Sequence, residues 1–263
     1  MQPEFSMSQV NAKIVSAGRL HLRPVYVFAA DNPPAGSVQV SAVITEGHKC
    51  LAKALLKMAI HPEVPPVYLG GDAMKGCCFG ASAWLGFMKM PPMMKAMYAS
   101  VPKGDGKHFA HYLKATPDLC DAGLKSLGKV TPPGKYLVMG AYDRQMENLP
   151  RPLSVLCFGS AEQIRNLSGL IHFNRADLFA PVIAAWGAHC ATFISYPAGF
   201  CENVPKDTAF IGPTAAYGND WFPPDLMALS MPISMAVQLS EDCEQSFVER
   251  CPGKTYPATR DQL

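Results

Sequence analysis

The chain has 263 residues, of which 49% are hydrophobic, and it carries 23 Lys and Arg against 21 Asp and Glu. This length and composition are enough to bury a core without disulfides or metal ions. The nearly balanced charge and the lack of a basic block argue against nucleic-acid binding. No apolar run approaches the ~20 residues of a membrane-spanning helix, and residues 1–13 lack the apolar segment of a secretory signal. We therefore expect a protein without nucleic-acid or membrane partners.

The nine cysteines indicate the redox environment. Their number is odd, and several lie in apolar runs, as Cys157 does in LSVLCFGS. A disulfide scaffold is normally short, dense in cysteine and preceded by a leader peptide. We therefore expect free thiols in a reducing compartment and a cytoplasmic protein.

The first half of the chain alternates helix and strand patterns. Apolar spacing predicts a helix over 8–18 that stops at Gly18, and β-branched and aromatic residues predict a strand over 24–30. A helical period continues over 48–60 until Pro62. Further along we expect a strand over 64–71, a loop entering a helix near Gly80, and a segment over 88–98 that is helical after its two prolines. Helices over 108–115 and 117–128 and a strand over 135–142 follow.

The second half begins with the clearest unit. A buried strand over 153–160 leads into a helix whose start carries Ser160 and, three residues on, Gln163, the signature of a capping box. This strand and helix form a crossover unit. We expect helix over 178–194, broken near Pro181 and Gly187, and a final helix over 234–250. Residues 251–263 read as an extended, partly ordered tail.

The domain organisation follows from what is missing between these elements. No low-complexity linker and no internal repeat are visible. We expect one domain over residues 1–263, with a core from about 8 to 250. Its fold class is α+β, a single domain with a mixed β-sheet surrounded by helices.

Three cysteines are candidates for a thiolate metal site. The chain has no C-x-x-C pair of the zinc-knuckle type and no compact ferredoxin spacing, so the fold would have to assemble any site from separate segments. Cys78 precedes a predicted helix, whose N-terminus would stabilise a thiolate. Cys190 lies among small residues, and Cys50 is near the start of its helix. The alternative is that each cysteine is a small buried hydrophobe, which suits Cys120, Cys157, Cys243 and Cys251 well.

Other residues suggest a ligand pocket or a second metal site. His189, beside Cys190, could act as a base or an outer hydrogen-bond donor. The segment 215–232 holds Asn219 and Asp220 between Tyr217 and Trp221, and it either lines a pocket or packs as a surface loop. His108 and His111 share a helix face, where a solvated or capping role is favoured. The methionines at 88, 90, 93, 94 and 97 could bind Cu(I), but core or oligomer interface is the favoured role. No nucleophile-elbow, P-loop or dinucleotide-binding motif occurs.

The order of these segments resembles a known family. PVYVFAA, CLAKALL from Cys50, GCCFGASAWLG, LSVLCFGSAEQIRNL, AHCAT and DLMALSMP follow one another as in domain of unknown function family 169, the uncharacterised ArCR family of anaerobic archaea and bacteria. The resemblance covers about residues 8–250. The family pattern implies cysteines at the positions of Cys50, Cys78 and Cys190. The loop here departs from the family pattern at Phe79, which leaves Cys77 as a rival for Cys78.

The resemblance implies a redox role, because some members of the family are associated with ferredoxin-type modules. We expect an iron–sulfur or soft-metal redox protein of anaerobic metabolism in which Cys50, Cys78 and Cys190 bind the metal. Such a protein would use a ferredoxin-like electron partner and would form a homo-oligomer, a dimer in the simplest case. Further candidate pocket residues are Cys77, Gly80, His189 and Asp220. The alternative function is a metal-free small-molecule binding protein or enzyme with structural cysteines and a pocket lined by Tyr217, Trp221 and Phe222.

Overall fold

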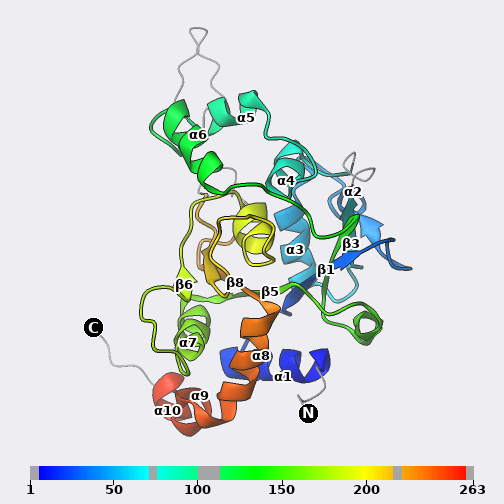
Figure 1. The fold of residues 1–263 in the computed structure, drawn as a ribbon. Helices are drawn as coiled ribbons and strands as arrows, with labels where there is room; N and C mark the ends of the chain where they lie inside the picture. The colour runs from blue at the N-terminus through cyan, green and yellow to red at the C-terminus, as the bar shows by residue number, and fades with distance from the viewer. Residues whose placement is uncertain (1–5, 71–75, 100–112, 216–220, 259–263) are drawn as a thin grey trace.

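The computed structural model of the chain describes residues 6–70, 76–99, 113–215 and 221–258. Within these ranges the strands form one eight-stranded sheet, and helices pack on both of its faces (Figure 1). The expected α+β class, with a mixed β-sheet surrounded by helices, is confirmed. None of the helices in the described ranges is both long and apolar enough to span a bilayer.

The sheet has the strand order β2-β3-β4-β1-β5-β8-β7-β6. Most neighbouring strands run antiparallel, but β2 with β3 and β6 with β7 are parallel, so the sheet is mixed. The four strands predicted over 24–30, 64–71, 135–142 and 153–160 correspond to β1, β3, β4 and β5. The strands are β1 Val25–Ala30, β2 Val38–Gln39, β3 Val67–Gly70, β4 Tyr136–Ala141, β5 Ser154–Ser160, β6 Val182–Ile183, β7 Ala209–Gly212 and β8 Leu226–Pro232.

The sheet consists of two halves with the same topology. The order β2-β3-β4-β1 in the first half matches β6-β7-β8-β5 in the second. In each half the two strands at the outer edge, β2 with β3 and β6 with β7, are parallel, and the other two pairs are antiparallel. The halves meet at the antiparallel β1–β5 pair in the centre, as a two-fold axis through the sheet would require. The expectation of no internal repeat is therefore wrong at the level of topology.

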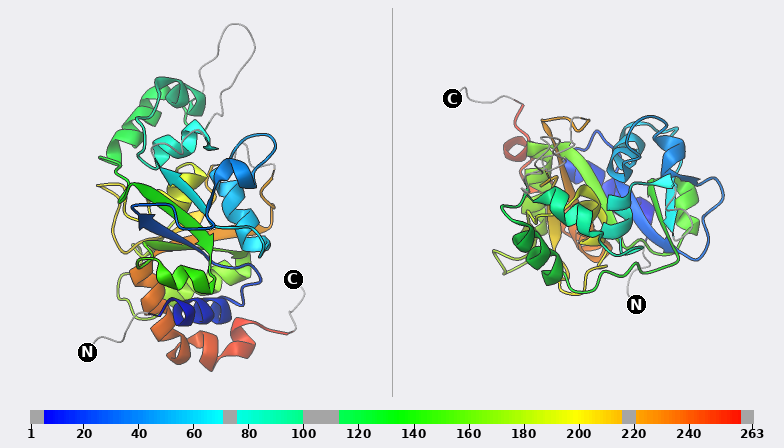
Figure 2. Two further views of the ribbon diagram at one scale, coloured as in Figure 1. Left: turned by 90° about the vertical axis from the view of Figure 1, so that its right-hand side faces the viewer. Right: turned by 90° about the horizontal axis from the view of Figure 1, so that it is seen from above.

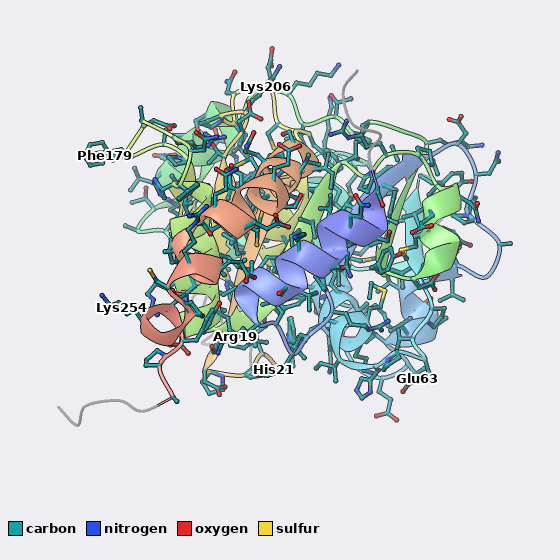
Figure 3. The ribbon with its side chains drawn as sticks, turned by 90° about the horizontal axis from the view of Figure 1, so that it is seen from below. Arg19, His21, Glu63, Phe179, Lys206 and Lys254 are labelled. Carbon is teal, nitrogen blue, oxygen red and sulfur yellow. The ribbon has the colours of Figure 1, made fainter. Side chains whose placement is uncertain are left out.

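One face of the sheet is covered by α1 Met7–Gly18, α7 Ala161–Ile171 and α8 Ile233–Asp242. Apolar residues of these helices, such as Ile14, Leu167 and Leu239, pack on Phe28 and Val155 of the sheet. Helices α1 and α8 lie side by side across this face (Figure 3). The predicted helix over 8–18 is confirmed, but the left-handed residue that ends it is Arg19 and not Gly18.

The opposite face carries α3 Leu51–Ile60, α4 Phe79–Trp84 and the π-helix η3 Ala191–Ser195. Leu55 of α3 and Phe193 of η3 pack on Leu69, Leu137 and Phe158 of the sheet. Figure 2 shows the sheet between this layer and the layer of α1 and the C-terminal helices. Beyond α4 the chain continues into α5 Pro92–Tyr98 and α6 Pro117–Ser126. Four short elements complete the described ranges before the C-terminal segment: α2 Val40–Val43, η2 Arg144–Asn148, η4 Cys243–Gln245 and α9 Phe247–Arg250.

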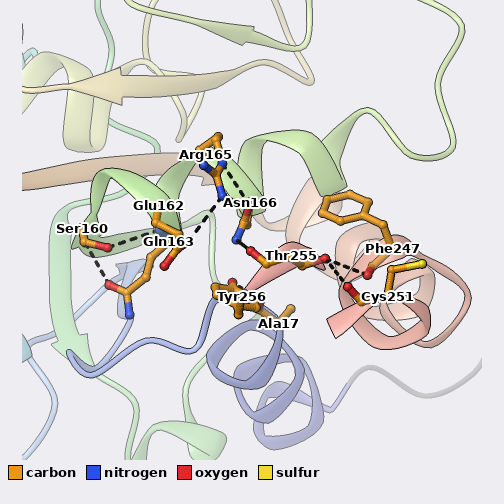
Figure 4. A network of polar contacts seen from close by, with 10 residues as sticks. All are labelled: Ala17, Ser160, Glu162, Gln163, Arg165, Asn166, Phe247, Cys251, Thr255 and Tyr256. Atoms are coloured by element: carbon orange, nitrogen blue, oxygen red, sulfur yellow. Dashed lines mark hydrogen bonds and ion pairs between the residues drawn. The ribbon is translucent and has the colours of Figure 1, made fainter. Parts of the chain in front are cut away.

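The start of α7 confirms the predicted capping box. The Gln163 backbone N–H donates to Ser160 Oγ at 3.3 Å, and the Ser160 N–H donates to Gln163 Oε1 at 2.8 Å (Figure 4). These two bonds satisfy donors that a helix N-terminus otherwise leaves unpaired. The sharp turn from β5 into α7 therefore follows from a local sequence signal.

The C-terminal segment packs against the body of the molecule. Residues 252–255 form the short helix α10 Pro252–Thr255, where an extended tail was expected. Tyr256 Oη donates to the Ala17 carbonyl at 2.7 Å, and the Arg19 guanidinium lies 4.2 Å from the centre of the Tyr256 ring. Asn166 donates to the Thr255 carbonyl, as Figure 4 shows. These contacts hold residues 252–256 against α1 and α7.

Two other helix predictions are wrong in part. Residues 178–188 form no helix: β6 lies there, and the chain becomes helical only at His189. The final helix predicted over 234–250 is interrupted between Cys243 and Ser246. The helix predicted over 108–115 lies mostly outside the described residues, and 113–115 are not helical.

Candidate functional site

The N-terminus of α3 brings two of the predicted cysteines together. Cys50 is the N-cap residue of α3, and the backbone N–H groups of Lys53 and Ala52 point at its sulfur. The same Ala52 N–H also points at the sulfur of Cys190, which is the N-cap residue of η3. Cys50 and Cys190 are far apart in the sequence, yet their sulfurs share one helix N-terminus, where negative charge is stabilised.

Cys77 and Cys78 both contact the backbone carbonyl of Lys49, the residue just before Cys50. The Cys78 N–H donates to the Lys49 carbonyl at 3.2 Å, and the Cys77 sulfur lies 3.6 Å from the same carbonyl oxygen. We call Cys50, Cys77, Cys78 and Cys190 the cysteine site. The fold therefore brings together the three predicted ligands and the predicted rival Cys77.

The sulfur of Cys78 lies in a setting that favours the thiolate. The Cys77 thiol hydrogen-bonds to it, and so does the His48 imidazole. The Ala81 N–H donates to it at 3.4 Å. These contacts outweigh burial and hold the pKa of Cys78 well below its usual range. The contact with Cys78 in turn raises the pKa of His48, so the two form a thiolate–imidazolium pair.

The other three thiols of the site are held protonated. The bond to Cys78 is the largest cause that raises the pKa of Cys77, followed by burial. Burial raises the pKa of Cys50 and Cys190, and the charge of a Cys78 thiolate adds to it. The metal-free site therefore holds one stable thiolate with protonated thiols beside it.

This arrangement predicts fast alkylation of Cys78 at low pH. In reduced protein treated with a chelator, Cys78 should react with iodoacetamide already at pH 6, where an ordinary thiol is almost fully protonated. The rate at pH 6 should fall about tenfold in a His48→Gln variant, because loss of the imidazolium moves the thiolate to higher pH. Peptide mass spectrometry against the exposed thiol of Cys251 measures both rates. Equal rates at Cys78 and Cys251 across the pH range would refute the assignment.

Small and aromatic residues surround the sulfurs. A Cβ atom at Gly80 would lie 3.8 Å from Cys78 Sγ, so the glycine keeps space open beside this sulfur. Tyr98 is also near the sulfurs, and its hydroxyl accepts a hydrogen bond from Trp84 Nε1 at 3.0 Å. Burial, together with the charge of the Cys78 thiolate, raises the pKa of Tyr98 to about 12. The Tyr98 hydroxyl is therefore a neutral group near the sulfurs.

His189 occupies an aromatic environment. Its ring lies 5.4 Å from Phe193 and 5.6 Å from Trp221, between ring centres. Burial lowers the pKa of His189 to about 4, so the imidazole is neutral, and its Nε2 atom has no hydrogen-bond partner in the described part of the chain. The other predicted pocket residue, Asp220, lies outside the described residues, as do Tyr217 and Asn219. Phe222 is buried and packs on Phe158.

The donor set of the site is soft. Its members are thiols with one imidazole in contact, a combination that suits zinc, Cu(I) or an iron–sulfur cluster and not calcium or magnesium. Among the described residues no three His, Cys, Asp or Glu side chains have the spacing of a finished metal site. Metal binding would therefore require the cysteine side chains to rotate toward a common centre.

Two residues of the site were not among the predicted site residues. His48 is two residues from Cys50, and that proximity was its only signal; its bond to Cys78 depends on the path of residues 48–50. Tyr98 carried no signal, because its place beside Cys78 and Cys190 comes from the packing of α5 against α4.

No curated protein and no solved structure matches the chain. The family model of domain of unknown function 169, described as uncharacterised ArCR, matches residues 13–242, a range that includes every residue of the cysteine site. The chain therefore belongs to the uncharacterised ArCR family, domain of unknown function 169.

Proposed function

We propose that the cysteine site binds an iron–sulfur cluster or another soft metal, with Cys50, Cys78 and Cys190 as ligands. The observation that carries this proposal is the convergence of thiols from three separate segments at the N-terminus of α3. A structural cysteine has no need of such neighbours, because an isolated buried thiol is a satisfied hydrophobe. Cys157, which is fully buried in the apolar core on the other face of the sheet, is of that kind.

The residues of the site have separable roles in this proposal. Cys78 is the first ligand, since its thiolate is stable before any metal arrives. Cys50 and Cys190 lose their protons on binding, which couples metal affinity to pH. Cys77 stands beside Cys78 as a hydrogen-bond donor to its sulfur or as an alternative ligand. His48 and Tyr98 supply outer polar contacts of the kind that tune a cluster.

A bound cluster would exchange single electrons with a partner, and we propose a ferredoxin-like protein for that role in anaerobic metabolism. Phe79, next to Cys78, is 73% exposed and would form part of the surface that such a partner meets. A cluster bound by thiolates that must stay reduced needs a reducing compartment, which supports the cytoplasm as the place where the protein works.

The test is a visible absorption spectrum with iron and acid-labile sulfide analysis, made on protein purified without oxygen. We expect broad visible absorption and iron and sulfide in matching amounts. Zinc or copper bound without sulfide would assign the site to a soft metal instead. Colourless protein that stays metal-free after reconstitution with iron and sulfide, and after addition of zinc, would overturn the proposal and favour a metal-free small-molecule binding protein.

A further inference from the structure

An exposed aromatic side chain lies directly beside the cysteine site. Phe79 is the first residue of α4, next to Cys78, and its side chain is 73% exposed. A single exposed apolar residue is common on protein surfaces, so the ring alone identifies no partner. The charges carried by the same part of the chain supply the second observation.

The segment that contains Cys50, Cys77 and Cys78 is positively charged. Of the 23 Lys and Arg and 21 Asp and Glu of the chain, 9 and 4 lie in residues 45–114, which gives this segment a net charge of +5. The remaining 14 basic and 17 acidic residues give a net charge of −3. The nearly balanced total therefore hides a strong asymmetry, with the positive charge in the segment that holds three of the four cysteines of the site.

Two of these lysines lie at the site itself. Lys49 precedes Cys50, and its backbone carbonyl accepts the Cys78 N–H. Lys53 is in the first turn of α3, and its charge acts on the Cys50 sulfur. Neither lysine forms a salt bridge within the described part of the chain, and the first turn of α3 contains no acidic residue. Cations are unfavourable at a helix N-terminus, so an anionic surface placed here would be stabilising.

The type of basic residue indicates the kind of contact. All nine basic residues of the segment 45–114 are lysines. Arginine is the residue enriched in stable interfaces and in clamps for phosphate, whereas lysine is a strongly hydrated charge on a flexible stem. A lysine surface speeds the encounter with an anionic partner more than it slows the separation. Short-lived contacts of small area are typical of electron-transfer proteins.

We propose that the face formed by Phe79, Lys49 and Lys53 docks an acidic electron-transfer protein. Phe79 is the apolar anchor of the contact, and the lysines attract carboxylates of the partner. The exposed ring and the charges belong to this chain with or without a metal, and only the choice of an electron-transfer protein rests on the proposed function. A nucleic acid suits this face less well, because the segment has no arginine to clamp phosphate and its described part has only one exposed aromatic ring on which a base could stack.

The experiment titrates the full-length protein with an acidic [2Fe–2S] ferredoxin, and calorimetry measures the affinity. We expect binding at about 25 mM NaCl that weakens at least about tenfold at about 300 mM NaCl, where exposed charges are screened. A basic cytochrome c is the probe of opposite charge and should not bind. Iron and sulfide are measured in the same sample, and docking is expected whether or not they are present. Missing iron and sulfide would thus contradict the proposed function alone, and missing docking would overturn this surface alone.

Two variants locate the docking surface. Lys53→Glu should weaken ferredoxin binding about tenfold at low salt, and the variant should stay folded because glutamate is favourable in the first turn of a helix. Phe79→Ser removes the apolar anchor and not a charge, so it should weaken binding about tenfold at both salt concentrations.

Matched controls come from side chains of the same kind elsewhere. Lys254 is exposed on α10, which packs on the other face of the sheet, and Phe179 is 91% exposed before β6 (Figure 3). Lys254→Glu and Phe179→Ser should bind ferredoxin like the wild type. Affinity that does not depend on salt, an equal loss in the control variants, or tighter binding of single-stranded oligothymidine than of ferredoxin would each overturn the proposal.

Discussion

Replacement of Cys50, Cys78 or Cys190 by serine is expected to weaken iron binding by about 100-fold or more, since even loss of an outer hydrogen-bond partner costs about 10- to 100-fold. Serine has nearly the shape of cysteine but keeps its proton at neutral pH and is a poor ligand for soft metals. Bound iron per chain after anaerobic reconstitution and gel filtration is the measurement. The effect should be largest for Cys78, whose thiolate is already formed in the metal-free protein.

Matched serine variants give the controls for this prediction. Cys251 is exposed and Cys157 is buried in the core on the other face of the sheet, so their variants should bind iron like the wild type. Cys77→Ser decides between the two neighbours: it should lower affinity modestly if Cys78 is the ligand and abolish binding if Cys77 is. Circular dichroism confirms that each variant is folded. Equal iron content in all these folded variants would contradict the ligand assignment.

The second large effect is expected on stability, from Gly86→Ala. Gly86 follows α4 with φ = +80°, and an added Cβ would lie 2.7 Å from the Val130 carbonyl oxygen. A left-handed conformation costs a residue with a side chain about 1–2 kcal/mol, and contact with rigid backbone typically costs about 1–3 kcal/mol more. We therefore expect the free energy of unfolding to fall by about 3 kcal/mol, measured by urea denaturation.

Gly199→Ala separates the two causes. Gly199 has φ = +75°, but an added Cβ would meet nothing within 4 Å. Its variant should lose only the conformational part, about 1–2 kcal/mol. If the Gly86 and Gly199 variants lose the same stability, the backbone around Val130 adjusts and the contact is not a constraint. Because Gly86 ends the helix that begins after Cys78, the Gly86 variant should also bind iron more weakly.

The parts of the fold that could be predicted from sequence have local causes. The strand β1 is a run of buried β-branched and aromatic residues, and β4 and β5 are largely apolar buried runs. The start of α7 follows from the pair Ser160 and Gln163. The helix prediction was wrong over residues 178–188 because their apolar composition suits a helix, whereas their path is set by the pairing of β6 with β7. The π-helix has bonds such as Tyr196 N–H to Ala191 carbonyl, and a period of 3.6 residues does not anticipate such a turn.

The candidate site could be predicted only in its cysteines. Spacing alone offered no metal motif, and the ligand positions came from the order of segments shared with the family. Their convergence depends on the shared α3 N-terminus and on the Lys49 carbonyl, which are tertiary features. The contact of His48 with Cys78 depends on the loop path in the same way. The internal repeat was hidden because β2 and β6 are two residues long and leave almost no pattern.

The repeated topology has a consequence for the origin of the site. Two four-stranded units joined about a two-fold axis are what gene duplication and fusion of a symmetric homodimer would leave behind. In both units the helix between the second and third strands starts after a Gly-x-x-Cys segment, which ends at Cys50 in one and at Cys190 in the other. The ancestral dimer would thus have had two identical thiols near its symmetry axis. Cys78 and His48 belong to the first unit, so today's asymmetric thiolate would be a later specialisation of one copy.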